Sequence, residues 1–582
     1  MDRMRGADIV AEMLVRLGVP YIAGVPGHTV LDLVDALYER RDRISSIVTR
    51  NEETASYLAD AYFRVAGRPM AVMAHNSVGA ANILTGVMNA RLDSSSMIVI
   101  SGEVWTKAQG RGGFQELASD RDAGTPDIFR GSVKRSWQVN KAEKLPEIML
   151  KAYKEAVTGR PGPVHIDITQ EAFAEWVEVK LPDDVAAFLP AYRVRGAADA
   201  TERAVELLVQ AERPAILAGG GSLRSGVGAE ILTIAERIGA PVATTVSGKG
   251  VIVETHDLAM GITGWVGTPA ANQAMRDADV ILAFGTRFSE TDTSGWQPNK
   301  PFNIPPTKLI HVDIDPAEIA RYYPAEVGIV GDARAVASDI VALLADARVD
   351  IDRTAAWRAT LEQMRSAWTD EVSELSASDA VPIAPARLTQ EIRKALKPDA
   401  IMMTDVGNSQ KWIIQQFMVT EPATIVTSLG GAAMGFGPCG VLGAQLAAPD
   451  RQVVCVTGDG SMSMSLHVLP TAVEYGLPVV YIVANDYAYA SVMRPQQMRF
   501  GEGRSLFTVF EDRFGNPYRL DFAAVAKAVG MDAERVTKPN ELAPALERAL
   551  SARRPYLLDV EIERDTYVPM SGGGAFVLPP KE

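Results

Sequence analysis

The segment QVVCVTGDG (452–460) is followed, after a stretch long enough for a helix, by PVVYIVAND (478–486). Each segment begins with a short apolar run, which predicts a buried strand, and ends in small or acidic residues. A βαβ unit of this kind is typical of parallel sheets, in which the carboxyl ends of the strands meet at one edge. We therefore expect Asp459 and Asp486 to lie close together at that edge.

The residues around these two aspartates suit a diphosphate and a hard cation. Gly458 and Gly460 flank Asp459 at a predicted helix start, where unhindered backbone N–H groups can approach phosphate oxygens. Mg²⁺ prefers oxygen ligands and often combines one or two carboxylates with phosphate. The sequence thus predicts a magnesium and diphosphate site. The alternative interpretation is a Gly-rich turn next to an unrelated strand end.

The same alternation of short apolar runs and amphipathic stretches continues along most of the chain. It is typical of parallel sheets covered by helices on both faces, so we expect an α/β fold with three doubly wound parallel-sheet domains. The expected boundaries are 1–180, 191–348 and 385–566, with a polar helical linker at 349–384 and a tail at 567–582. The other runs that predict strands are YIAGV (21–25), MAVMAH (70–75), SMIVISG (96–102), PVHIDI (163–168), PAILAGG (214–220), PVATT (241–245), VILAFG (280–285), LIHVDID (309–315), AIMMTDVG (400–407), TIVTSLGG (424–431) and PYLLDVEI (555–562).

The composition argues against several classes of protein. The 582 residues carry a formal net charge of −14, without the clustered basic face that nucleic acid or an anionic membrane requires. The two cysteines, Cys439 and Cys455, lie in apolar segments and predict buried packing residues in a reduced compartment. No secretory signal and no apolar run of membrane-spanning length is found, so we expect a cytoplasmic protein.

The spacing from GDG to Asn485-Asp486 resembles the signature of thiamine diphosphate-dependent enzymes. A distant segment, TRNEETASYLADAYFRVAGRP (49–69), resembles the part of that family's first domain that carries the cofactor-activating glutamate. Glu52 aligns with this glutamate. Its implied role is a hydrogen bond to N1′ of the aminopyrimidine, which helps to remove the C2 proton of the thiazolium. The bland alternative for Glu52 is a solvated charge at a helix start.

Further segments resemble the same family. GFQE (113–116) is similar to a loop that places Gln115 over the reacting centre, and LGGAAMGFG (429–437) to the segment whose Met434 bends the cofactor. TDVGNSQKW (404–412) matches the turn that touches the diphosphate. The resemblance implies that Mg²⁺ is held by Asp459, Asp486 and the carbonyl of Ala488. It implies cofactor contacts at Gly407, Asn408, Ser409, Met434, Gly458, Gly460, Ser461 and Asp486.

The resemblance covers essentially the whole chain and is closest to the acetolactate synthase-like branch. It implies a pyrimidine-binding, a central nucleotide-type and a diphosphate-binding domain. It also implies a homodimer or homotetramer, because active sites in this family lie between two subunits, with YVPMSGGGAF (567–576) as a tail over the site. The implied activity is that of a transferase or lyase, a 2-oxo acid decarboxylase and carboligase.

The central domain contains a Gly-rich turn after a strand, AGGGSLRSG (218–226), which by itself is weak support for a dinucleotide. Three later segments are GITGWVGTPAAN (261–272), GTRFS (285–289) and VDIDPAEI (312–319). Together with the Gly-rich turn they resemble the places where acetolactate synthases hold FAD and oxalyl-CoA decarboxylases hold an ADP moiety. Many relatives keep this fold with the site empty, so a flavoprotein and an empty site both remain open. The candidate nucleotide contacts are Gly220, Gly221, Gly264, Thr268, Gly285, Arg287 and Asp313.

The sequence departs from acetolactate synthases at three places. His28 stands where a Gly is expected, and His75 resembles a histidine of benzoylformate decarboxylase and cyclohexane-1,2-dione hydrolase. A pair of imidazoles beside the reacting centre can move protons to and from a carbonyl oxygen, although each is also explained as a structural histidine. The segment after the metal turn lacks the expected Gln-Trp, which leaves Tyr489, Val492 and Met493 as candidate pocket residues.

These departures keep other functions open. A lyase or hydrolase of 1,2-diones or 2-hydroxyacyl-CoA compounds is the first alternative within thiamine chemistry. A nicotinamide-dependent dehydrogenase built on the Gly-rich turn, or a catalytically inactive regulatory paralogue, would belong to other classes. In every enzymatic case the expected partner is a small molecule, a 2-oxo acid or a diketone.

Overall fold

The computed structural model describes residues 2–117 and 124–571 of the chain. The expected tail at 567–582 therefore lies mostly outside the described residues. The chain folds as two compact units, which we call the first and the second unit. The first unit comprises Met1–Ala191, Ser428–Val453 and Met464–Val479, and the second comprises Tyr192–Thr427, Val454–Ser463 and Val480–Glu582.

The helices and strands of the first unit alternate along the chain, as the sequence predicts. They are β1 (Asp2–Arg5), α1 (Gly6–Arg16), β2 (Tyr21–Gly24), η1 (His28–Val30), α2 (Leu31–Tyr38), β3 (Ser45–Val48), α3 (Glu52–Ala66), β4 (Ala71–Ala74), α4 (Ser77–Leu92), β5 (Ile98–Glu103), α5 (Thr125–Phe129), β6 (Ser136–Val139), α6 (Leu145–Val157), β7 (Val164–Thr169), α7 (Gln170–Ala174), β8 (Trp176–Val179), α16 (Phe436–Ala447) and α18 (Val468–Glu474).

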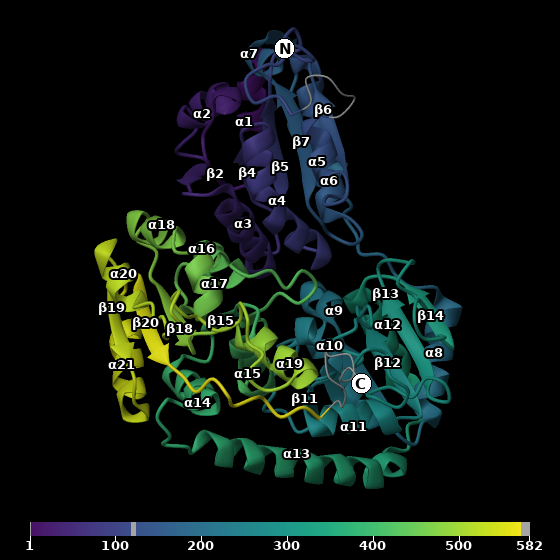
Figure 1. Ribbon diagram of the computed structural model, residues 1–582. Coiled ribbons are helices and arrows are strands. Elements are labelled where there is room, and N and C mark those ends of the chain that lie inside the picture. Colours follow the sequence, from purple (N-terminus) through teal and green to yellow (C-terminus); the bar gives the residue numbers. More distant parts are fainter. Residues whose placement is uncertain (1, 118–123, 572–582) are drawn as a thin grey trace. The chain divides into compact units, whose positions relative to one another are not determined.

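A six-stranded parallel sheet with the order β3-β2-β4-β5-β7-β6 forms the centre of the first unit (Figure 1). Helices α1, α2 and α6 share one apolar core with the sheet. Helix α3 packs on β2 and β4 and also contacts α4 and α16. Every residue from Thr54 to Phe63 is buried, which is the pattern of a helix enclosed on all sides.

The second unit contains two sets of alternating elements. They are α8 (Ala198–Gln210), β9 (Pro214–Ala218), α9 (Gly220–Ser225), α10 (Gly228–Ile238), β10 (Val242–Thr244), β11 (Ala259–Ile262), α11 (Pro269–Asp277), β12 (Val280–Phe284), β13 (Lys308–Asp313), β14 (Val327–Val330), α12 (Ala333–Asp346), α13 (Ala355–Ser376), α14 (Pro385–Ala395), β15 (Ile401–Thr404), α15 (Asn408–Gln416), β16 (Ile425–Val426), β17 (Val453–Gly458), α17 (Asp459–Met464), β18 (Val479–Asn485), α19 (Ala490–Phe500), α20 (Phe522–Ala528), β19 (Asp532–Val536), α21 (Pro539–Ser551) and β20 (Tyr556–Glu561).

Two further six-stranded sheets organise these elements, with the orders β11-β10-β9-β12-β13-β14 and β16-β15-β17-β18-β20-β19. Successive residues of β9 face opposite layers. Ile216 and Ala218 join the core formed with α8, α10 and α12, whereas Ala215 and Leu217 join the core formed with α11. This alternation is that of a strand buried on both faces, which confirms the predicted α/β fold with doubly wound parallel sheets.

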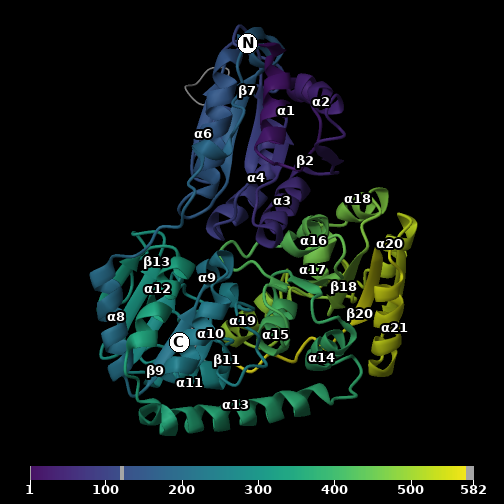
Figure 2. The ribbon, with the colours of Figure 1, turned by 180° about the vertical axis from the view of Figure 1, so that it is seen from behind.

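The polar stretch predicted as a linker forms the long helix α13 (Figure 2). Most of its surface is exposed, as expected for a charged segment, but Trp357 and Leu361 are buried. Both side chains belong to the core beneath α11, and Nε1 of Trp357 donates to the carbonyl of Pro214 at 3.2 Å. The start of this helix is therefore part of the central domain's packing.

Leu361→Ala tests this packing. The side chain is 0% exposed, so its truncation should lower the free energy of unfolding by about 2–5 kcal/mol, the usual cost of a core Leu→Ala change. Chemical denaturation measures this value. The exposed neighbour Glu362→Ala is the control and should have almost no effect, and equal effects of the two substitutions would contradict a docked helix.

Among the described residues, no helix has both the length and the apolar character needed to cross a membrane. Cys439 and Cys455 are both buried, as their apolar segments predict, and neither forms a disulfide within the described residues.

Candidate functional site

Three neighbouring strands of the third sheet, β15, β17 and β18, end at the same edge. The loop after β15 leads through Gly407 into α15, β17 leads through Gly458 into Asp459, and β18 leads through Asn485 into Asp486. Ligands of open parallel sheets bind beyond the carboxyl ends of the strands, so this edge is where a ligand is expected. The predicted convergence of Asp459 and Asp486 follows from this strand order.

Both aspartates are held by backbone N–H groups at this edge. Oδ1 of Asp459 accepts from the backbone of Gly460 at 2.8 Å, and Oδ1 of Asp486 accepts from the backbone of Ala488 at 3.2 Å. Burial raises the pKa of Asp459 to about 7. Burial, together with the neighbouring charge of Asp459, raises the pKa of Asp486 to about 8. A bound cation would relieve both effects and keep the pair ionised at neutral pH.

Four buried polar atoms at this edge have no hydrogen-bond partner among the described residues: Nδ2 of Asn408, Oγ of Ser409, Oδ2 of Asp459 and Oδ1 of Asn485. Leaving a buried polar group unpaired costs about 1–3 kcal/mol, so such a group indicates a missing ligand or water. Lys411 donates to Oδ1 of Asn408 at 3.2 Å, which leaves the Nδ2 donors of Asn408 for a ligand. The donors of Asn408 and Ser409, after β15, fit a diphosphate. The acceptor oxygens at the ends of β17 and β18 fit its metal ion.

The other predicted contacts lie in the same three loops. Gly407 precedes the first turn of α15 with φ 129°, and Gly460 and Ser461 are buried in α17. Ala488 is fixed by an antiparallel bridge to Val509. Groups of three or more His, Cys, Asp or Glu side chains placed to hold a metal are absent from the described residues.

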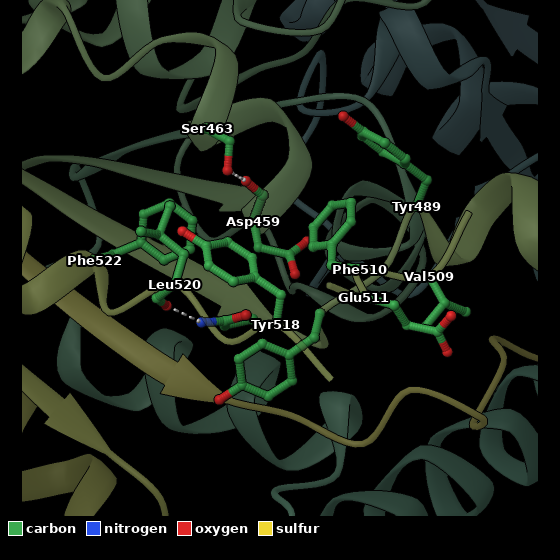
Figure 3. A pocket seen from close by; sticks show the side chains of 11 residues that line it. Asp459, Ser463, Tyr489, Val509, Phe510, Glu511, Tyr518, Leu520 and Phe522 are labelled. Carbon is green, nitrogen blue, oxygen red and sulfur yellow. Dashed lines mark hydrogen bonds between the residues drawn. The ribbon is translucent and has the colours of Figure 1, made fainter. Parts of the chain in front are cut away.

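A cavity of about 300 Å³ adjoins Asp459 (Figure 3). Asp459 and Tyr489 line it, and Phe510 and Tyr518 form part of its aromatic wall. The ring of Tyr489 lies over the start of α17, where a Cβ added to Gly460 would be only 2.4 Å from Cε1 of Tyr489. Tyr489 is thus the only one of the three predicted pocket residues that lines this cavity.

Met493 and Val492 have other surroundings. Met493 is 1% exposed and packs in a small apolar cluster with Ala488, Ala490 and Val509. Val492 is 57% exposed. The packing of Met493 supports the backbone around Ala488, so this residue acts on the loop rather than on the cavity.

In the first unit, Glu52 is the first residue of α3 and is 9% exposed. Asn51 caps the helix by accepting from the backbone of Glu53 at 2.9 Å. Asn82, on α4, donates to Oε2 of Glu52 at 3.1 Å. This hydrogen bond fixes the orientation of the carboxylate at the helix start.

His75 connects two of the predicted residues through defined hydrogen bonds. The backbone N–H of Thr29 donates to Nδ1 of His75 at 3.3 Å, so this nitrogen is an acceptor, and Oγ1 of Thr29 lies 2.7 Å from it. Nε2 of His75 then carries the proton and donates to Oε1 of Gln115 at 2.5 Å. Burial lowers the pKa of His75, which favours this neutral form.

Gln115 occupies a strained backbone conformation with φ 59°. Ser77 donates to its carbonyl oxygen at 2.6 Å, and the carboxylate of Glu116 accepts from the backbone of Gly110 and Gly113 at 2.5 and 3.0 Å. Strain held by surrounding hydrogen bonds is typical of functional positions. Because Oε1 of Gln115 is occupied by His75, its amide N–H₂ group is left as the donor of this side chain.

His28 completes this cluster. Its ring lies edge-on to His75 at 6.3 Å and to Phe114 at 6.1 Å, and it is exposed. The structure therefore brings together His28, His75 and Gln115. Met434 is half-buried in the loop before α16.

The seven candidate nucleotide contacts follow strands of the central sheet, mainly at its carboxyl edge, yet several have structural roles. Thr268 caps α11 by accepting from Ala271 at 3.2 Å and donates to the carbonyl of Met260. The backbone N–H of Gly221 donates to the carbonyl of Gly285 at 3.0 Å. The remaining candidates are Gly220 at the start of α9, Gly264 after β11, Arg287 after β12 and Asp313 at the end of β13.

Thr29, Ser77 and Asn82 are site residues that sequence reasoning missed. Their partners are 46, 38 and 30 residues away in the chain. No local pattern marks such contacts, because Thr, Ser and Asn are ordinary residues of turns and helix starts. Lys411 is a further residue of this kind. It lies in the TDVGNSQKW segment (404–412), and its closeness to Asn408 in the chain is the one sequence signal for the contact between them.

Three family models for thiamine pyrophosphate enzymes match the chain in order. The N-terminal TPP binding domain matches residues 4–123, the central domain 201–340 and the C-terminal TPP binding domain 405–560. Together with the three parallel sheets and the buried carboxylates, these matches define an enzyme that depends on thiamine diphosphate.

The chain is also similar over its whole length to individual proteins. A probable acetolactate synthase large subunit of Methanocaldococcus jannaschii is 34% identical over 97% of this chain and 93% of its own. The acetolactate synthase isozyme 3 large subunit of Escherichia coli is 32% identical, and the acetolactate synthase large subunit of Haemophilus influenzae 31%, each over 99% of this chain and 98% of the relative. The chain belongs to the acetolactate synthase-like branch of the thiamine pyrophosphate enzyme family.

The raised pKa values of Asp459 and Asp486 predict an opposite pH dependence with and without metal. Both groups ionise near pH 4 in the unfolded chain but at about 7 and 8 in the folded one, so without metal the free energy of unfolding should fall as the pH rises through this range. Bound Mg²⁺ requires the ionised pair, so its stabilising effect should be small near pH 5.5 and large near pH 8.5.

Thermal unfolding with Mg²⁺ and thiamine diphosphate, or with a chelator, measures both trends. The variant Asp459→Asn removes one of the two titrating groups. It should therefore weaken both the pH dependence of unfolding without metal and the pH dependence of the Mg²⁺ effect. A shift in Tm on adding Mg²⁺ that is equal at the two pH values would contradict metal binding by this pair.

Proposed function

We propose that this chain is a Mg²⁺- and thiamine diphosphate-dependent decarboxylase and carboligase for 2-oxo acids, of acetolactate synthase type. Asp459, Asp486 and the carbonyl of Ala488 would hold Mg²⁺. Gly407, Asn408, Ser409, Gly458, Gly460 and Ser461 would hold the diphosphate. The observation that carries this proposal is the set of unpartnered polar atoms on Asn408, Ser409 and Asp459 at one sheet edge.

When bound, thiamine diphosphate supplies a nucleophilic carbon and takes up the electrons released when a bond beside a carbonyl breaks. Glu52 would accept or share a proton at N1′ of the aminopyrimidine. Its burial and the hydrogen bond from Asn82 to Oε2 leave Oε1 for that contact. Met434 would support the bent form of the cofactor.

Gln115 would donate from its amide to the carbonyl oxygen of the substrate. His75, neutral and bonded on both ring nitrogens, would position Gln115 rather than carry protons itself. His28 is exposed beside them and would be the group that exchanges protons with the reacting oxygen. Tyr489 would bound the substrate pocket.

The cluster of His28, His75 and Gln115 favours a second candidate, cleavage of a 1,2-dione or a 2-hydroxyacyl-CoA compound. Cleavage of such a compound ends with a proton delivered to the released fragment, whereas carboligation ends with a carbon–carbon bond to an acceptor carbonyl. A proton-carrying residue such as His28 therefore favours cleavage. The matched thiamine family models favour either activity over a nicotinamide-dependent dehydrogenase.

Occupation of the central domain by FAD is also part of the proposal. It is supported by the positions of Gly220, Gly264 and Arg287, which follow β9, β11 and β12. Asp313, the last residue of β13, adds to this support. A yellow preparation with flavin absorbance would support it, and a colourless, fully active one would refute it. We further propose a cytoplasmic homodimer or homotetramer in which two chains share each active site.

Carbon dioxide release from short, branched and aromatic 2-oxo acids tests the proposed function, with thiamine diphosphate and Mg²⁺ present or omitted. Glu52→Gln should lower turnover by about 10³-fold while Tm changes little, because it removes only the proton-accepting oxygen. Activity near that of the unchanged chain would refute the role of Glu52. No release from any 2-oxo acid by cofactor-bound protein, together with cleavage of a 1,2-dione, would select the second candidate.

Thr29→Val tests the positioning of Gln115 through His75. The change keeps the shape of the side chain but removes the hydroxyl that lies 2.7 Å from Nδ1 of His75, so kcat should fall by about tenfold. Thr29→Ser keeps the hydroxyl and should restore most of the activity. If Val and Ser variants were equally active, the hydroxyl would have no such role.

A further inference from the structure

Within the first unit, the loop that carries Met434 is held by hydrogen bonds to α4 and to Asp93, the residue after it. We call residues 428–435 the wedge loop. Oγ of Ser428 lies 2.6 Å from Oδ2 of Asp93 and 2.8 Å from Oδ1 of Asn89. The backbone N–H of Gly430 donates to Oδ1 of Asp93 at 2.8 Å. Asp93 therefore binds the beginning of the wedge loop with both carboxylate oxygens.

Asp93 is itself fixed by a buried ion network on α3 and α4. Arg64 lies 3.0 Å from Oδ2 of Asp93 and forms two bonds, of 2.7 and 2.9 Å, to the carboxylate of Asp60. Asn89 donates to Oδ2 of Asp60 at 2.8 Å. The side chains of Arg64, Asp60 and Asp93 are 9%, 0% and 3% exposed, so solvent hardly screens these contacts. The result is a rigid support for the wedge loop.

The far end of the wedge loop rests on the same helix. The hydroxyl of Tyr57, one turn beyond Glu52 on α3, donates to the carbonyl of Met434 at 3.3 Å. The guanidinium of Arg64 lies 4.6 Å from the ring centroid of Phe436, directly after the loop. Ala432 lies between these two held ends of the wedge loop and adopts φ 45°. Such a strained value is retained only in a firmly held loop.

Two glycines permit the close approach. A Cβ on Gly430 would lie 2.6 Å from Oδ1 of Asp93, and a Cβ on Gly431 would lie 2.3 Å from Oδ1 of Asn89. These contacts are far shorter than van der Waals distance, so any side chain would push the loop off its support. The Gly-Gly pair thus has a packing reason next to the residue that the cofactor would touch.

We propose that Ser428, Asp93 and Tyr57 are positioning residues that set the place of Met434 and thereby the affinity for thiamine diphosphate. The proposal rests on the proposed function, because Met434 acts only if the cofactor binds. Helix α3 then has two tasks, since it presents Glu52 at its start and supports the wedge loop along its length. A group held by such a supporting shell binds more tightly because less freedom is lost on binding.

Calorimetric titration of the full chain with thiamine diphosphate, at saturating Mg²⁺, tests the proposal. Ser428→Ala and Tyr57→Phe each remove one hydroxyl from the support and should weaken binding by about tenfold. Ser95→Ala and Tyr62→Phe are matched controls. Both side chains are buried, and their hydrogen bonds go elsewhere: Ser95 donates to the carbonyl of Asp60 at 3.2 Å, and Tyr62 accepts from Arg68 at 3.1 Å. Both controls should change the affinity less than about twofold.

A double-mutant cycle with Met434→Ala separates positioning from a general structural effect. If Ser428 and Tyr57 act through Met434, their substitution should change the affinity little once Met434 is Ala. Equal weakening in both backgrounds, or equal weakening by the controls, would overturn the proposal while the proposed function stood. Absence of thiamine diphosphate binding by the unchanged chain would overturn both.

Discussion

Burying two carboxylates beside each other is unfavourable unless a cation joins them, and Asp459 and Asp486 are placed in this situation by the order of the strands. Because β17 and β18 are neighbours in a parallel sheet, their carboxyl ends deliver both residues to one edge. The N–H groups of Gly460 and Ala488 offset part of the cost, and the pKa of each aspartate nevertheless remains raised. The arrangement is explained by a ligand that brings positive charge.

In the first unit, hydrogen bonds between protein groups hold the neutral and anionic side chains of the candidate site in place. Helix α3 starts with Glu52, whose orientation is set by Asn82, and its later turns carry the network that holds the wedge loop. Beside it, Thr29 fixes the tautomer of His75, and His75 fixes the amide of Gln115. Glu52 and Gln115, which would contact the cofactor and the substrate, are thus each oriented by a partner that would not.

Much of this could be predicted from the sequence where the signal is local. The inner strands were found because burial on both faces produces continuous apolar runs. Seven strands are not predicted. β1 and β8 form a small two-stranded sheet, and β3, β6, β11, β14 and β19 lie at the edges of the larger sheets, where one side is open and runs such as DAERV mix polar and apolar residues. The motif spacing predicts Asp459 and Asp486, and the resemblance of the segment 49–69 to a family segment predicts Glu52. Thr29, Asn82 and Asp93 are not predicted, because their roles arise from contacts between segments brought together only by folding.

The proposed site depends most directly on a cation between Asp459 and Asp486. Mn²⁺ is a suitable probe, because it accepts the same oxygen ligands as Mg²⁺ and gives anomalous scattering. In crystals grown with Mn²⁺ and thiamine diphosphate, we expect one anomalous peak per chain, bound by both carboxylates, the carbonyl of Ala488 and the diphosphate. Thiamine diphosphate bound without a metal peak at these two aspartates, or a peak elsewhere with this edge empty, would contradict the proposed site.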